Sequence, residues 1–201
     1  MTDIRDDISY MRRLAEQGRR GPILGGTFLT AAGLVFGATC LIHWAAVTGR
    51  IPFPETQLGN LWWGACALFA IVWFALFFRM RSKGQVKSSA SNAAFGLAWS
   101  ACGVGIIVSA ASVSITASVL HSAEIQIVST WLAFVFYGTA WTISAAVARR
   151  WWMLGAAIAA FATAPLLALL SGDPRQLLAM AFAILITLCL PGFKLMADES
   201  K

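Results

Sequence analysis

Charged side chains are scarce in this 201-residue chain. Asp, Glu, Lys and Arg together make up 12% of it, whereas they account for about 25% of an ordinary soluble domain. Hydrophobic residues make up 59%, and the mean hydropathy is +0.73. A soluble fold of this size could not bury so much apolar surface. The composition therefore excludes a soluble globular domain and indicates that the solvent is lipid.

The motifs that usually mark chemistry are also missing. The four cysteines form no Cys-x-x-Cys pair, which argues against a thiol oxidoreductase; we expect them to be small buried residues, with a Cys40–Cys66 disulfide as the alternative. There is no Gly-x-Ser-x-Gly nucleophile motif, phosphate-binding glycine loop or paired-carboxylate motif. Away from their ends, its apolar runs contain none of the charged residues that ion-coupled transporters commonly use as relays. The sequence proposes no catalytic residue and no cofactor.

Six long apolar runs are present instead. In lipid each must satisfy its own backbone hydrogen bonds and is therefore a helix, and the alternation of a β-barrel is absent. We predict an all-α integral membrane protein with six transmembrane helices in three successive hairpins, preceded by a short amphipathic helix. The predicted spans are 22–48, 58–78, 93–120, 125–148, 151–170 and 176–195. They form one domain, 22–196, between a cytoplasmic arm, 1–21, and a tail, 197–201.

The breaks between these runs support the count of six. Pro52 and Pro54 cannot continue a helix, and Gly172 can end one just before Pro174 begins the next. The pair Arg149-Arg150 lacks Gly or Pro, but reading through it would leave two arginines in the middle of one helix. Each would cost about 2.5–3.5 kcal/mol at the bilayer centre. A tight hairpin at this pair is the cheaper solution.

Basic residues predict the orientation. With six spans and a cytoplasmic N-terminus, thirteen of the fifteen lysines and arginines lie inside, and only Arg50 and Arg175 lie outside. We therefore expect both termini in the cytoplasm of a bacterium, with an uncleaved first helix in the inner membrane. The basic residues on the cytoplasmic side would face anionic lipid headgroups. This placement accounts for the net charge of +6, so the charge does not indicate a nucleic-acid partner.

The N-terminal arm has the pattern of an amphipathic helix. Its apolar residues recur at spacings of four, three and four, and acids fill its first turns while arginines, among them Arg12 and Arg13, fill its last. The apolar face comprises Ile4, Ile8, Met11 and Ala15. This face would lie on the inner membrane surface or would bind a cytoplasmic protein partner.

Small residues mark the expected helix contacts. Gly33 and Gly37 form a Gly-x-x-x-Gly step in the first span, and small residues recur in the third and fifth spans. The predicted packing residues are Gly33, Gly37, Ser114, Ser118, Gly155 and Ala159. The alternative is a hydroxyl-lined path along the third and fifth spans for a small neutral or weakly polar solute.

A group of titratable residues is expected near the outer face. The candidates for a metal site are His43, His121 and Glu124, with Glu55 and Asp173 at the same face. Their spacing matches no metal motif, so the alternative is a set of interfacial polar residues. A haem held by the two histidines is a further interpretation of the same residues.

One resemblance extends over most of the chain. It is carried by the run Asp6-Asp7-Ile8-Ser9-Tyr10-Met11-Arg12, by Gly18-Arg19-Arg20 and Gly25-Gly26, and by Leu190-Pro191-Gly192 before Leu195-Met196. With these motifs the chain resembles a group of small bacterial multi-pass inner-membrane proteins to which no activity is assigned. The resemblance implies a bacterial inner membrane and transfers no role to any residue.

These patterns favour a non-enzymatic membrane protein. The first hypothesis is a regulatory or scaffolding role that acts through the arm and the basic loops. The alternatives are a small transporter or channel, and a metal- or haem-dependent activity at the outer face. The expected partners are the bilayer, anionic headgroups on the cytoplasmic side and a cytoplasmic protein; the sequence does not determine the oligomeric state.

Overall fold

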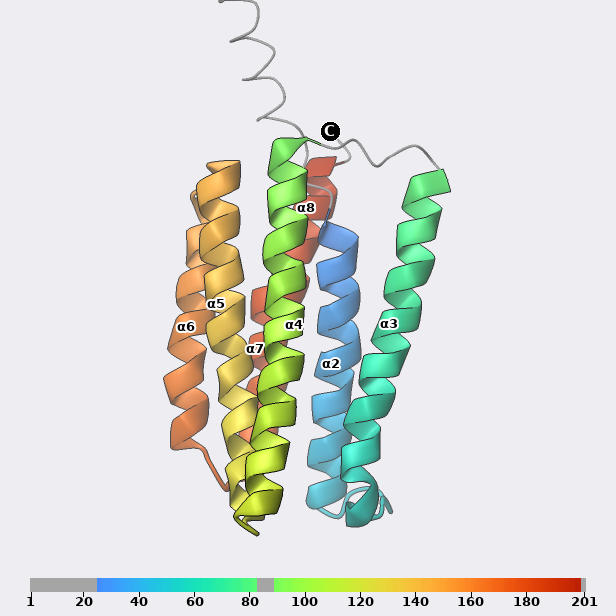
Figure 1. The fold of residues 1–201 in the computed structure, drawn as a ribbon, viewed down its shortest axis with the longest axis vertical. Coiled ribbons are helices and arrows are strands. Elements are labelled where there is room, and N and C mark those ends of the chain that lie inside the picture. Colours follow the sequence, from blue (N-terminus) through green and yellow to red (C-terminus); the bar gives the residue numbers. More distant parts are fainter. Residues whose placement is uncertain (1–24, 83–88, 200–201) are drawn as a thin grey trace, which may run out of the picture.

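The computed structural model describes residues 25–82 and 89–199, and within these ranges every regular element is a helix (Figure 1). Six helical stretches are long and apolar enough to cross a membrane, which confirms the predicted all-helical, membrane-spanning class. The last stretch joins three elements without a turn. The elements are α2 (Gly26–Val47), η1 (Glu55–Gln57), α3 (Leu58–Ser82), α4 (Ala90–Val119), η2 (Ala123–Ile127), α5 (Val128–Ala148), α6 (Trp152–Leu169), α7 (Arg175–Ile184), η3 (Leu185–Cys189) and α8 (Leu190–Glu199).

Residues with positive φ lie in the turns between these helices. Gly49 follows α2 at φ 69°, and Gly172 separates α6 from α7 at φ 86°, a region that glycine enters without steric cost. Arg149 ends α5 in the left-handed conformation at φ 52°, and the chain then reverses into α6. The predicted break at the two arginines is therefore present, and it uses a non-glycine residue.

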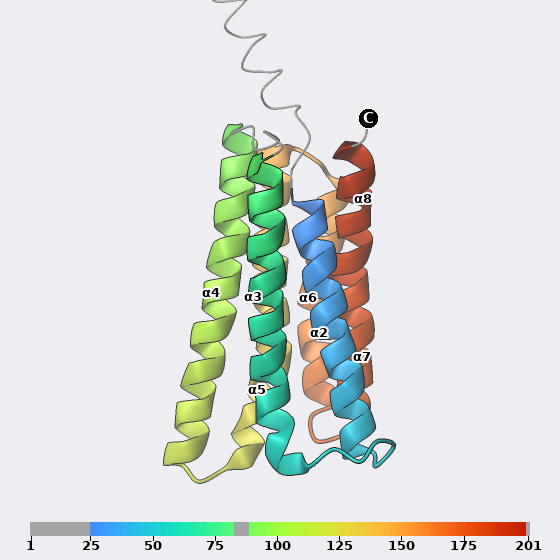
Figure 2. The same cartoon turned by 90° about the vertical axis from the view of Figure 1, so that its right-hand side faces the viewer.

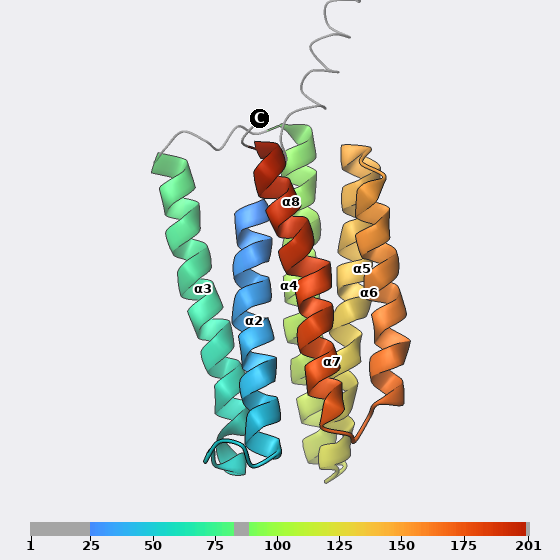
Figure 3. The same cartoon turned by 180° about the vertical axis from the view of Figure 1, so that it is seen from behind.

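The helices pack side by side as a bundle (Figures 1 and 2). The most extensive contact is between α5 and α6, and α4 packs against the other side of α5. Helix α2 contacts α7, η3, α8 and α3, so the first and last spans of the chain are neighbours (Figure 3). Helix α3 lies at the edge and packs mainly against α2. The tightly packed part of the bundle is therefore α2, α5, α6 and the last span.

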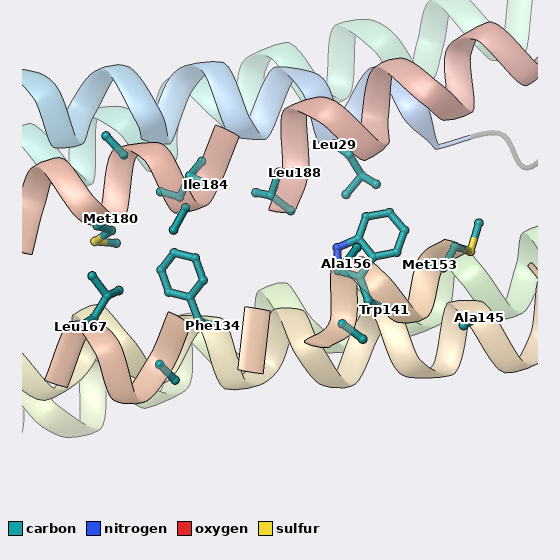
Figure 4. Close-up of a cluster of buried hydrophobic side chains, with 14 of the residues drawn as sticks. Leu29, Phe134, Trp141, Ala145, Met153, Ala156, Leu167, Met180, Ile184 and Leu188 are labelled. Atoms are coloured by element: carbon teal, nitrogen blue, oxygen red, sulfur yellow. The ribbon is translucent and has the colours of Figure 1, made fainter. Parts of the chain in front are cut away.

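Large apolar side chains fill the space between these four spans (Figure 4). Phe134 and Trp141 of α5 have no exposed surface, and they face Ile184 and Leu188 of the last span. Met153 of α6 is equally buried. In lipid such contacts hold helices together by van der Waals packing, because the surrounding chains are as apolar as the side chains.

One turn of the last span is a π-helix. It comprises Leu185–Cys189 and lies between α7 and α8. The indole Nε1 of Trp141 donates a hydrogen bond of 2.8 Å to the backbone carbonyl of Thr187 in this turn. A π-turn shifts the register of backbone bonding, and here the buried indole from α5 binds one of its carbonyl groups. The core is therefore joined to the irregular turn by a specific polar contact.

Candidate functional site

The start of α2 and the end of α8 lie at the same end of the bundle, together with the end of α3 and the turn between α5 and α6 (Figure 1). We call this the charged end. Its described charged residues are Arg79, Arg81, Arg149, Arg150, Lys194, Asp198 and Glu199. Arg50 and Arg175 belong to turns at the opposite end. The charged end thus collects most of the described basic residues and the point where the N-terminal arm joins the bundle.

Glu199 binds the first backbone groups of α2. Its Oε1 accepts hydrogen bonds from the backbone N–H groups of Gly25, at 3.3 Å, and Gly26, at 3.4 Å. The first N–H groups of a helix have no partner within the helix, and the helix dipole favours a negative charge there. Gly25 has no side chain that could cap α2. The last helix therefore supplies the cap for the first, and residue 25 is held beside the C-terminal segment.

Two further contacts of α8 lie on α6 and the turn before it. Arg150 and Asp198 form an ion pair of 2.6 Å, with about a quarter to a third of each side chain exposed. Lys194 places its Nζ 4.4 Å from the ring centre of Trp152. Partly exposed ion pairs contribute about 0–1 kcal/mol, and a cation–π contact at such a site about 0.5–1 kcal/mol. These contacts orient α8 more than they stabilise the bundle.

A shallow open groove lies between α6 and the last span, beside the Lys194–Trp152 contact. Its lining is Trp152, Gly155, Ala156, Ala159, Ile186, Leu190, Pro191 and Lys194. A Cβ atom on Gly155 would have no neighbour within 4 Å. Two predicted packing residues, Gly155 and Ala159, thus line an open groove.

The first and last spans approach each other at backbone distance. A Cβ atom built on Gly192 would lie 2.9 Å from both the carbonyl oxygen of Gly26 and the backbone nitrogen of Thr30. One built on Gly26 would lie 2.6 Å from the carbonyl oxygen of Gly192. Farther along α2, Gly33 packs against Cys189. Glycine is required where two backbones come this close.

The other predicted packing residues have different surroundings. Gly37 is buried, and the nearest side-chain atoms to its built Cβ are 3.9 Å away, on Ile184 and Leu185. Ser114 and Ser118 lie on the exposed face of α4, where each hydroxyl donates to a carbonyl four residues earlier, at 2.9 and 3.0 Å. Their hydrogen-bonding capacity is used mainly within α4 itself.

The titratable residues predicted near the outer face lie on different elements. His43 of α2 accepts a hydrogen bond at Nδ1 from the indole Nε1 of Trp62, at 3.0 Å. His121 and Glu124 are exposed in the connection between α4 and α5. Asp173 caps the next helix by accepting from the backbone N–H of Arg175 at 2.7 Å. No three His, Cys, Asp or Glu residues of the described ranges are grouped so that they could hold a metal ion.

Some predicted residues cannot be placed, and some contacts were not predicted. The arm residues Ile4, Ile8, Met11, Arg12, Arg13 and Ala15 lie outside the described ranges. All four cysteines are free, so the alternative of a Cys40–Cys66 disulfide is not present.

Two contacts were not predicted from the sequence. The cap from Glu199 and the Trp141–Thr187 hydrogen bond join residues that are 173 and 46 positions apart, so no local sequence pattern indicates them. The Pro191-Gly192 step was visible in the sequence, but its partner on α2 was not.

No protein-family model, no curated protein and no solved structure matches the chain.

Proposed function

We propose that this chain is a non-enzymatic membrane protein with a regulatory or scaffolding role, in which a rigid bundle presents the N-terminal arm to a cytoplasmic partner. The single observation that carries the proposal is the bond between Glu199 and the start of α2. It holds the point from which the arm leaves the bundle beside the basic residues of the charged end. A docking segment whose attachment point is already fixed loses less conformational entropy when it binds a partner, and this increases the affinity.

The proposed orientation places the charged end in the cytoplasm of a bacterium, at the inner membrane. Five described basic residues support it: Arg79, Arg81, Arg149, Arg150 and Lys194, against Arg50 and Arg175 at the other end. Basic residues in short loops are retained on the cytoplasmic side. We further propose that the six spans insert as three successive hairpins, an order supported by the contacts of α2 with α3 and of α4 with α5.

The interior of the bundle supports a structural role more than transport. Several of its buried polar side chains are bonded within the protein: Thr39 and Ser144 donate to carbonyls four residues earlier, at 2.8 and 2.7 Å. The amide of Gln176 donates to the carbonyl of Leu167 at 2.9 Å. A solute path needs polar groups that can exchange partners with the solute. Thr39, Ser144 and Gln176 already have partners within the bundle.

The orientation can be tested with reporter fusions. We expect a green fluorescent protein fused after residue 201 to fluoresce, because that protein matures in the cytoplasm, and alkaline phosphatase at the same point to be inactive. Phosphatase fused after Asp173, in the turn between α6 and α7, should be active, since this turn lies at the opposite end. An active phosphatase at the C-terminus would contradict the orientation.

The arm's role can be tested with two double variants of equal charge. Ile4→Asp with Ile8→Asp places two acids on the predicted apolar face, whereas Ser9→Asp with Gln17→Asp places them on the opposite side of the predicted helix. A photo-crosslinker at Met11 should capture one specific protein in the parent chain and in the second variant. Capture should fall at least tenfold in the first variant.

The same experiment separates the partner from the membrane surface. If the crosslinker at Met11 captures only lipid in the parent chain, the arm is a membrane-surface helix and the scaffolding proposal is wrong. Equal protein capture by the two double variants would also contradict it. The melting temperature of each variant in detergent controls for damage to the bundle.

A further inference from the structure

The groove between α6 and the last span combines an apolar wall with one basic mouth. Gly155, Ala156 and Ala159 form one side and Ile186 with Leu190 the other, and Lys194 lies at the mouth. Because these α6 residues have small side chains, the groove stays open along a little more than one turn of the helix, from Gly155 to Ala159. A lining of this kind offers no polar partner below the mouth. It therefore suits a hydrocarbon chain and not a polar solute.

The mouth of the groove has the chemistry of a membrane interface. Trp151 is 82% exposed at the start of α6, and the indole ring of Trp152 lies under the Nζ of Lys194. Tryptophan and lysine at the end of a membrane helix lie at the level of the lipid headgroups. The mouth is thus placed where a phosphate group would be, and the groove leads from it toward the acyl chains.

The charges at the mouth are complementary to an anion. Arg150 is neutralised by Asp198, whereas within the described ranges no carboxylate forms an ion pair with Lys194. Arg149 is exposed in the same turn as Arg150 and carries a second positive charge at this end of the bundle. Basic recesses between membrane helices are suited to anionic headgroups.

We infer that this groove binds one anionic glycerophospholipid, with its phosphate at Lys194 and one acyl chain along Gly155 and Ala159. The lipid fills the space that the small side chains of α6 leave open against Ile186 and Leu190. It covers the wall beside the π-turn, and its headgroup lies next to the ion pair that orients α8. The inference depends on the membrane-spanning assignment and not on the role proposed for the arm.

Native mass spectrometry of the full chain in detergent tests this site, with phosphatidylglycerol and phosphatidylcholine as probes. We expect one tightly bound phosphatidylglycerol, at least tenfold preferred over phosphatidylcholine. Inorganic phosphate at millimolar concentration should not displace it, because the acyl chain supplies much of the affinity. Displacement by phosphate would mean that the site holds a free anion and would overturn the inference.

Matched variants locate the lipid. Gly155→Leu fills the groove and should weaken binding of phosphatidylglycerol at least tenfold, whereas Gly96→Leu on the exposed face of α4, also without a neighbour within 4 Å of its Cβ, should leave it unchanged. Lys194→Gln should abolish the preference for phosphatidylglycerol. Arg81→Gln, at the charged end on α3, should retain it.

Two results would overturn the site. One is unchanged phosphatidylglycerol binding in Gly155→Leu, and the other is an equal loss of preference in Lys194→Gln and Arg81→Gln, which would indicate general charge attraction. If Gly155→Leu fails to fold, Lys194→Glu at an exposed position replaces it. This variant should then exclude phosphatidylglycerol while binding phosphatidylcholine.

Discussion

Replacing Gly192 with alanine should lower the free energy of unfolding by about 1–3 kcal/mol, the usual range for overpacking a close contact. The added Cβ would meet the Thr30 hydroxyl oxygen and lie 2.9 Å from two backbone atoms of α2. A backbone cannot move aside as a flexible side chain can, so α2 and α8 must separate. Alanine in a helix is otherwise favoured over glycine by about 0.8–1.0 kcal/mol, and the clash must exceed this gain.

The measurement is unfolding of the purified chain in mixed micelles by a denaturing detergent. Gly96→Ala and Gly103→Ala are matched controls, because a Cβ at either position has no neighbour within 4 Å; both should be neutral or slightly stabilising. Gly26→Ala meets the same contact from the other side. The double variant with Gly192→Ala should therefore cost less than the sum of the two single variants. A Gly192→Ala chain as stable as the parent would contradict the close approach of the two spans.

Trp141→Ala should be the more damaging change, at about 3–5 kcal/mol, which is the range for truncating a buried tryptophan. Trp141 has no exposed surface, packs edge-on against Trp99 with ring centres 5.1 Å apart, and donates to the carbonyl of Thr187. Trp141→Phe keeps most of the ring and removes the donor. It should cost about 1–3 kcal/mol, because the carbonyl in the π-turn is left buried without that partner.

Trp63 provides the control for this pair. Its side chain is 68% exposed on α3, so Trp63→Ala should change stability by less than about 0.5 kcal/mol, the usual range for surface substitutions. Near-ultraviolet circular dichroism adds a second observable, since the signal of the clustered rings should fall in the Trp141 variants only. Equal losses in Trp63→Ala and Trp141→Ala would mean that the core is not centred on Trp141.

The spans and the breaks between them could be read from the sequence for a physical reason. A bilayer core demands about 20 apolar residues per helix and makes a buried arginine costly, and both conditions are local. Thus the hairpin at Arg149 was predictable without Gly or Pro, and the chain does reverse there. Gly172 likewise lies with positive φ in the turn after α6, before Pro174.

Which helices pack against each other could not be read from any local sequence pattern, and only the tertiary structure decided it. Lipid chains are as apolar as leucine, so the hydrophobic pattern does not say which side of a membrane helix faces protein. The small residues of α2 and of α4 look equivalent in sequence, yet Gly33 packs against Cys189 while Ser114 is exposed. The cap on α2 required Glu199, 174 residues away from Gly25. Such contacts depend on how whole helices are placed relative to one another. The sequence of any single span does not determine this placement.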